Sequence, residues 1–215
     1  MAEFWGGLTL VVAVSFLALA FGLRAVIHRR STGSWGFNRL GGKAWTAEWS
    51  AGILFRAAIL AALAAPALQL TGTLAPFTAA DNSAFRAAGA ALTVAGIAIT
   101  IVSQHVMGTS WRVGVDQEER TKLVTTGLFA LVRNPVFTGM IIAFAGMALL
   151  TPNPVSVFGA GSLIAAIEIQ VRAVEEPYLL RTHRDAYVAY ATSVGRLVPG
   201  FGTLPDNRAR EENRS

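Results

Sequence analysis

The stretch VFTGMIIAFAGMALLTPNPVSVFGAGSLIAAIEIQV, residues 136–171, decides the fold. It holds two apolar runs, residues 136–150 and 155–171, that are separated only by Thr151-Pro152-Asn153-Pro154. Each run approaches the ~20 residues that a helix needs to cross a bilayer, and a four-residue turn with two prolines allows only a tight connection. The stretch therefore predicts a hairpin of two membrane helices.

Three further apolar segments precede this hairpin, and each is about as long as a bilayer is thick. They run from Trp5 to Val26, from Ala51 to Leu70 and from Ala87 to Val106. The composition agrees, since 53% of the residues are hydrophobic and 14% are charged, whereas soluble domains carry about 25% charged residues. We therefore expect an all-α, polytopic membrane protein with five transmembrane helices.

The distribution of Lys and Arg predicts the orientation. The segment from Arg24 to Arg56 holds six of these residues, that from Met107 to Arg133 holds four, and the chain from Arg172 onward holds seven. Basic residues collect on the cytoplasmic side of membrane helices. We therefore expect the N-terminus outside and the C-terminus in the cytoplasm, in an integral protein of a bacterial inner (plasma) membrane. The first span lacks a basic leading segment, so it should be retained rather than cleaved as a signal peptide.

Several classes of function are disfavoured by the same composition. There is no cysteine, which excludes disulfides, thiolate zinc sites and cysteine nucleophiles. His105 and His183 lack partners at metal-ligand spacing, so no metal site is expected. The net charge of +5 follows from membrane insertion and does not indicate nucleic-acid binding. The oligomeric state is left open.

Three regions follow from these segments. Residues 1–86 hold the first two helices and their cytoplasmic loop, residues 87–204 hold a core of three helices and an amphipathic segment, and residues 205–215 form a tail rich in Arg, Glu and Asn. The tail is expected to be disordered because it has almost no apolar residues to bury.

Side chains suited to chemistry concentrate between Gln104 and Arg196, on the predicted cytoplasmic side. They fall into three groups: Leu123 to Phe129 with Arg133 to Gly139; Glu168, Arg172, Glu175 and Glu176; and Tyr187, Tyr190 and Arg196. The spacing of the second group allows all four side chains to share one helix face. Ionisable residues beside a membrane span usually face a bundle interior or a wet cavity, although they can also form a simple ion-pair ladder.

Local rules give some of these residues a structural interpretation. Asn134 suits the N-cap of a helix, and Pro135 suits its first position. Gly127 is typical of a turn, and Gly139 of a close contact between helices. Pro177 should end or kink the helix that carries Glu175 and Glu176.

The order of these motifs resembles a known family. It reads L-V-T-x-G-x-F at Leu123 to Phe129, R-N-P-x-F-x-G at Arg133 to Gly139, R-x-x-E-E from Arg172 to Glu176, and Y-x-x-Y from Tyr187 to Tyr190. This order is similar to that of the isoprenylcysteine carboxyl methyltransferase and phospholipid N-methyltransferase superfamily, in its bacterial form. The resemblance covers Gln104 to Pro199. It departs from the common pattern at Asn134, where His is frequent, and at Phe137, where Tyr is frequent.

The resemblance implies an enzyme that transfers a methyl group from S-adenosylmethionine to a lipophilic acceptor, an isoprenoid-type carboxylate or a lipid. It implies a cofactor pocket formed by the C-terminal half at the cytoplasmic face, with Arg133 and Glu176 as catalytic residues. The cofactor-binding residues that it implies are Gln104, Val124, Thr126, Gly127, Phe129, Asn134, Pro135, Phe137, Gly139, Arg172, Glu175 and Tyr187.

Roles within that pocket follow from the chemistry of the cofactor. Arg133 or Arg172 would bind its carboxylate, and Glu175 or Glu176 its ammonium or ribose. An aromatic ring such as Phe129, Phe137 or Trp111 would shield the adenine or face the sulfonium. A carboxylate acceptor would need only to be oriented, for example by Arg133, whereas an amine or hydroxyl would need a base such as Glu175 or Glu176.

Two other functions are consistent with parts of the sequence. A membrane reductase of the steroid reductase type would use NADPH and resembles the family in its final helices, although this chain adds the pair Glu175-Glu176. A non-catalytic transporter would need polar residues near the middle of several spans. The first two spans offer essentially none.

Overall fold

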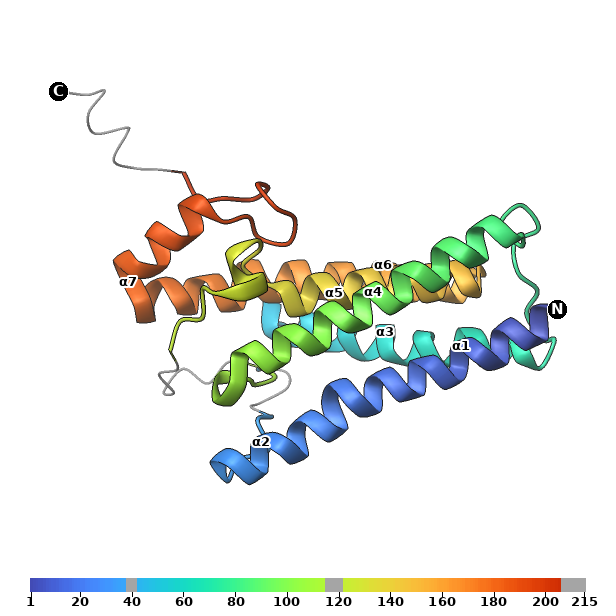
Figure 1. The fold of residues 1–215 in the computed structure, drawn as a ribbon, viewed down its shortest axis with the longest axis horizontal. Helices are drawn as coiled ribbons and strands as arrows, with labels where there is room; N and C mark the ends of the chain where they lie inside the picture. The colour runs from blue at the N-terminus through green and yellow to red at the C-terminus, as the bar shows by residue number, and fades with distance from the viewer. Residues whose placement is uncertain (38–41, 115–121, 206–215) are drawn as a thin grey trace.

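A computed structural model describes residues 1–37, 42–114 and 122–205, and these form an elongated bundle of helices (Figure 1). Outside the helices, the described residues pair only in isolated bridges, such as that between Val132 and Gly195. The elements in chain order are α1 (Ala2–Leu17), the π-helical η1 (Ala18–Leu23), α2 (Arg24–Thr32), α3 (Ala47–Leu70), α4 (Ser83–Met107), η2 (Gly108–Ser110), η3 (Gly127–Ala130), α5 (Pro135–Leu150), α6 (Pro154–Ile169), the π-helical η4 (Gln170–Glu175) and α7 (Glu176–Ser193).

The prediction of an all-α polytopic membrane protein is confirmed. Four continuous helical stretches are long and apolar enough to cross a bilayer: Ala2–Thr32, Ala47–Leu70, Ser83–Ser110 and Pro154–Ser193. The fifth predicted span corresponds to α5, an apolar helix of 16 residues, which is shorter than the ~20 residues of a full crossing. The number of five crossings therefore remains a prediction, while all five predicted helices are present.

Glycine allows the closest helix contact in the bundle, between α4 and α5. A Cβ atom at Gly96 would lie 2.3 Å from the backbone nitrogen of Ala143 and 2.6 Å from the carbonyl oxygen of Gly139. A Cβ at Gly139 would in turn lie 2.5 Å from the Thr100 hydroxyl. Such contacts between small residues let two backbones approach closely and pack by dispersion and weak polar contacts. Gly139 thus has the helix-contact role that the local rules predicted.

The turn between α5 and α6 is a helical hairpin, as predicted. Asn153 is completely buried, and its side chain accepts hydrogen bonds from the backbone nitrogens of Val155 (3.1 Å) and Ser156 (3.0 Å). The Ser156 hydroxyl accepts from Asn153 N (3.1 Å), which completes a capping box. The Asn153 amide also donates to the carbonyl of Ala65 on α3 (3.3 Å), so the turn is bonded to a third helix.

Pro177 was predicted to end or kink the helix, and it does not end it. The chain stays helical through Pro177, which lies in the first turn of α7 directly after the π-helical η4. A proline ring clashes with the carbonyl four residues before it, and a wider π turn relieves that clash. The break lies instead at Arg184, whose φ of 43° and ψ of −120° are not helical, and the chain turns there within α7 (Figure 1).

The predicted disordered tail falls at residues 206–215 outside the described part of the chain, apart from Pro205. The division of the chain at residue 86 stays a prediction. The N-terminus and the start of α4 lie at one end of the bundle, while α2, α7 and the segments that follow α4 lie at the other (Figure 1).

Candidate active site

A polar cleft lies where α4 ends, α5 begins and α7 turns back. Its cavity volume is about 140 Å³, and the cleft is open to solvent on one side. Its walls come from the segment after α4, from residues 122–134 and from α7. The lining residues are Met107, Ser110, Arg112, Gly114, Lys122, Leu123, Val124, Phe129, Arg133, Asn134, Glu175, Tyr178, Leu179, Tyr187 and Tyr190.

The lining combines both charges with aromatic rings. Glu175 supplies a carboxylate, and Arg112 and Lys122 supply cations. The Arg112 guanidinium lies 5.6 Å from the centre of the Tyr178 ring, within the range of a cation–π contact. The cleft can therefore bind a ligand that carries positive and negative groups and a flat ring.

Tyrosines on α7 connect the cleft to the segment before α5. The Tyr190 hydroxyl donates a hydrogen bond to the carbonyl of Phe129 (2.5 Å), which lies in η3. Tyr187, which is 1% exposed, meets Tyr190 edge to face at 6.3 Å. The turn at Arg184 brings both rings to this position, because it directs the second half of α7 back toward η3.

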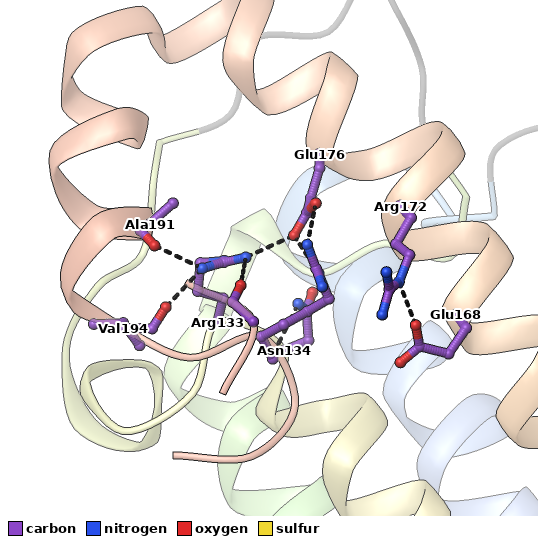
Figure 2. Close-up of polar contacts among 9 residues, drawn as sticks. Arg133, Asn134, Glu168, Arg172, Glu176, Ala191 and Val194 are labelled. Carbon is purple, nitrogen blue, oxygen red and sulfur yellow. Dashed lines mark hydrogen bonds and ion pairs between the residues drawn. The ribbon is translucent and has the colours of Figure 1, made fainter. Parts of the chain in front are cut away.

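Beside the cleft, Glu176 joins two arginines from distant parts of the chain (Figure 2). Its Oε1 accepts from Arg133 Nη2 (2.7 Å) and from Arg196 Nε (2.6 Å), and its Oε2 accepts from Arg196 Nη2 (2.9 Å). The Arg133 side chain is 1% exposed and that of Glu176 10%, so the pair is shielded from water. The Glu176 carboxylate raises the pKa of the Arg196 guanidinium above its usual range, chiefly by accepting its hydrogen bonds.

The same Arg133 side chain also binds the backbone around the end of α7. It donates to the carbonyls of Ala191 (2.9 Å), Val194 (2.6 Å) and Gly202 (3.0 Å), as Figure 2 shows for the first two. Four hydrogen bonds therefore occupy its two terminal nitrogens. In this arrangement Arg133 holds α7 and the segment after it against the start of α5.

Asn134 extends this attachment. It occupies the N-cap position of α5, with Pro135 following as predicted, but its side chain does not cap the helix. Its backbone nitrogen (3.1 Å) and its side-chain amide (3.2 Å) both donate to the carbonyl of Arg196. The segment after α7 passes beside Asn134, so the Asn134 side chain bonds to this segment and does not cap α5.

The predicted shared face of Glu168, Arg172, Glu175 and Glu176 is only partly present. Glu168 and Arg172 form an ion pair, and their side chains point to the same side of the helix as that of Glu176 (Figure 2). Glu175 departs from this face and lines the cleft instead. The four side chains do not all keep one face, because Glu175 and Glu176 are neighbours in the chain and point in different directions.

The structure thus brings some of the predicted site residues together and not others. Those that line the cleft are Val124, Phe129, Arg133, Asn134, Glu175 and Tyr187. Outside it, Gln104 is buried and donates to the carbonyl of Ala20 in η1 (2.9 Å). The remaining predicted site residues also do not line the cleft. They are Thr126 and Gly127 at the start of η3, Pro135, Phe137 and Gly139 on α5, Arg172 in η4 and Glu176 at the start of α7. The cofactor and catalytic roles of all these residues stay predictions.

The sequence did not predict the cleft-lining residues that follow α4. Ser110 ends the short helix η2, whereas Arg112 and Lys122 lie in loops, and their spacing in the sequence does not predict a shared cavity. One signal was present, since polar residues follow the third apolar segment directly at the predicted cytoplasmic side. Trp111, considered as a cofactor contact, is instead buried away from the cleft at 2% exposure.

Fold and site together define a polytopic helical membrane protein with a polar cleft lined mainly by its C-terminal half. Residues 84–186 match the phospholipid methyltransferase family. Over 85 residues the chain is 31% identical to protein-S-isoprenylcysteine O-methyltransferase B of Arabidopsis thaliana, covering 40% of this chain and 43% of that protein. Over 115 residues it is 28% identical to protein-S-isoprenylcysteine O-methyltransferase of Dictyostelium discoideum, covering 53% of this chain and 48% of that one.

A solved structure has a related fold. It is that of the eukaryotic intramembrane Ras methyltransferase, an isoprenylcysteine carboxyl methyltransferase, with a TM-score of 0.56 and 18% identity over 90% of this chain and 67% of that one. Over these parts of its length, the chain is therefore similar to phospholipid methyltransferases and isoprenylcysteine methyltransferases. It spans less than half the length of the curated relatives named above. Those two relatives are eukaryotic and give no support to the expected bacterial origin.

Proposed function

We propose that this protein transfers a methyl group from S-adenosylmethionine to a lipophilic acceptor, an isoprenoid-type carboxylate or a lipid. The observation that carries the proposal is the cleft, most of whose lining lies within the stretch that matches the phospholipid methyltransferase family. The relatives are named as methyltransferases of isoprenylcysteine, which is a lipophilic acceptor. None of the relatives named above is a reductase or a transporter.

The side chains of the cleft fit this cofactor. Glu175 would accept hydrogen bonds from its ammonium or ribose, and Arg112 or Lys122 would bind its carboxylate. Tyr178 and Tyr187 line the cleft, and an aromatic ring there would shield the adenine or attract the sulfonium. S-Adenosylmethionine supplies a methyl group that its sulfonium makes electrophilic, so the protein needs no covalent nucleophile.

The contribution of the chain is then orientation and exclusion of water. The network of Arg133, Glu176 and Arg196 holds α7 over the cleft, and we assign these residues to positioning. Arg133 and Glu176 could act as catalytic groups only if these side chains rearrange when ligands bind. In the structure, both oxygens of Glu176 and both terminal nitrogens of Arg133 already form hydrogen bonds within the protein. Glu175 lines the cleft and is the carboxylate that would face the ligand.

The cofactor is tested by titration calorimetry of the purified protein with S-adenosylhomocysteine and, separately, with NADPH. We expect binding of the first alone; binding of NADPH without S-adenosylhomocysteine would contradict the proposal. Glu175→Gln should weaken the affinity at least ~10-fold, because hydrogen bonds to charged groups contribute about 1.5–3 kcal/mol. Glu168→Gln is the matched control, since Glu168 pairs with Arg172 away from the cleft.

The acceptor is tested by incubating membranes with a radiolabelled methyl donor and extracting the product into organic solvent. Label that base releases indicates an ester and so a carboxylate acceptor. Label that resists base indicates an amine or an ether. Label that remains wholly in the aqueous phase would contradict a lipophilic acceptor.

The proposed topology places the cleft in the cytoplasm, with the N-terminus outside. It rests on the basic residues between the first and second spans and after the third, in contrast to the single Arg86 before α4. Because the chain has no cysteine, single cysteines can report it directly. In intact cells an impermeant maleimide should label Thr73→Cys and not Lys43→Cys, and the reverse pattern would invert the topology.

A further inference from the structure

One wall of the cleft rests on the N-terminal half of the chain. This wall is the segment after α4, in which Ser110, Arg112 and Gly114 line the cleft. Trp111 between them has an extended backbone, with φ −67° and ψ 132°, so its side chain points the other way. Its ring is buried against α2 and residues 33–37, which together are called the arm below.

The arm surrounds Trp111 with four kinds of contact. The Arg24 guanidinium lies 5.2 Å from the ring centre and donates a hydrogen bond to the carbonyl of Gly108 at the start of the wall. His28 and Phe37 meet the ring edge to face, at 5.6 Å and 6.1 Å. The backbone nitrogen of Val113 donates to the carbonyl of Gly36 (2.7 Å). The wall is thereby fixed at both ends and in the middle.

Gly36 makes this fit possible. Its φ of +72° favours glycine, and a Cβ there would lie 2.7 Å from Cζ3 of Trp111 and 2.9 Å from Cδ2 of His28. Gly33, three residues earlier, has a similar φ of +81°, but a Cβ there would meet nothing within 4 Å. Both glycines therefore have a positive φ, but only at Gly36 would an added side chain push against Trp111.

We propose that the arm is a positioning element of the cofactor site: it sets the place of Ser110 and Arg112 in the cleft through Trp111. The arm lies outside residues 84–186, which match the family, so this role is specific to the N-terminal part of the chain. The inference rests on the proposed function, because it takes the cleft to be the site for S-adenosylmethionine.

The test compares two glycine variants by titration with S-adenosylhomocysteine. Gly36→Ala should weaken binding at least ~10-fold with the number of sites per chain unchanged, because small displacements of positioning groups have large effects. Gly33→Ala should stay within about 2-fold of the wild type, although it carries the same backbone strain. A purely structural defect would instead lower the number of sites and the thermal midpoint in both variants.

A second pair decides the matter if Gly36→Ala does not fold. Arg24→Met removes the hydrogen bond to Gly108 and the charge over Trp111. Arg29→Met, five residues further along α2, removes a charge that lies over Trp35 at 4.4 Å. Weaker binding by Arg24→Met alone supports the proposal. Equal binding by both members of each pair overturns it. Failure of the wild type to bind would overturn the proposed function instead.

Discussion

Replacing Glu176 by Gln tests whether the buried ion network holds the fold of the C-terminal half. The substitution keeps the shape of the side chain and removes its charge. It leaves the guanidinium of Arg133, which is 1% exposed, without its only anionic partner among the described residues. It also turns one acceptor of Arg196 into an amide that donates.

The size of the effect follows from the geometry. Three hydrogen bonds of 2.6–2.9 Å end on the Glu176 carboxylate, all from guanidinium groups. Breaking a buried pair costs about 3–5 kcal/mol, because an uncompensated charge stays in the interior. We therefore expect Glu176→Gln to lower the free energy of unfolding by ~3 kcal/mol or more. Glu168→Gln, at an exposed pair four residues apart, should cost about 0.3–0.5 kcal/mol.

The free energies are measured by denaturant unfolding in detergent micelles, followed by helical circular dichroism. A double-mutant cycle of Glu176→Gln with Arg196→Gln isolates the coupling of that pair, which should exceed ~1 kcal/mol. Equal stability of the Glu176 and Glu168 variants would refute the structural role. Loss of methyl transfer at unchanged stability would then return Glu176 to the catalytic role that the sequence suggested.

Two further predictions concern the bundle and are read from thermal unfolding. Gly96→Ala should destabilise the protein by about 1–3 kcal/mol, since the new Cβ would lie 2.3 Å from the backbone nitrogen of Ala143. The control Gly161→Ala, whose Cβ would meet nothing within 4 Å, should be neutral or stabilising. Equal effects of the two substitutions would contradict the close contact. Asn153→Ala should lower the free energy of unfolding by about 1–2 kcal/mol, and by more than Asn82→Ala does. Both side chains cap helices, but of the two only Asn153 is buried and bonded to α3. The opposite order would refute this reasoning.

The sequence by itself determined the helices and the hairpin. Spans of apolar residues leave the chain no option but helices in a bilayer, since every backbone group must be paired within the segment. The turn before α6 could also be predicted, because Asn153 and Pro154 act on their own backbone neighbours. These are local effects, so they are readable without knowing what the helices touch.

Only the tertiary structure decided which polar groups meet. Arg133 and Glu176 are 43 residues apart, and their pairing depends on where α7 turns, at Arg184 and not at Pro177. The fold of this region also separates two chemically identical neighbours: Glu175 lines the cleft, whereas Glu176 binds Arg133 and Arg196. Trp111 is fixed by an arm from the other half of the chain. Such partners arise from packing over long sequence distances, so the sequence motifs alone do not reveal them.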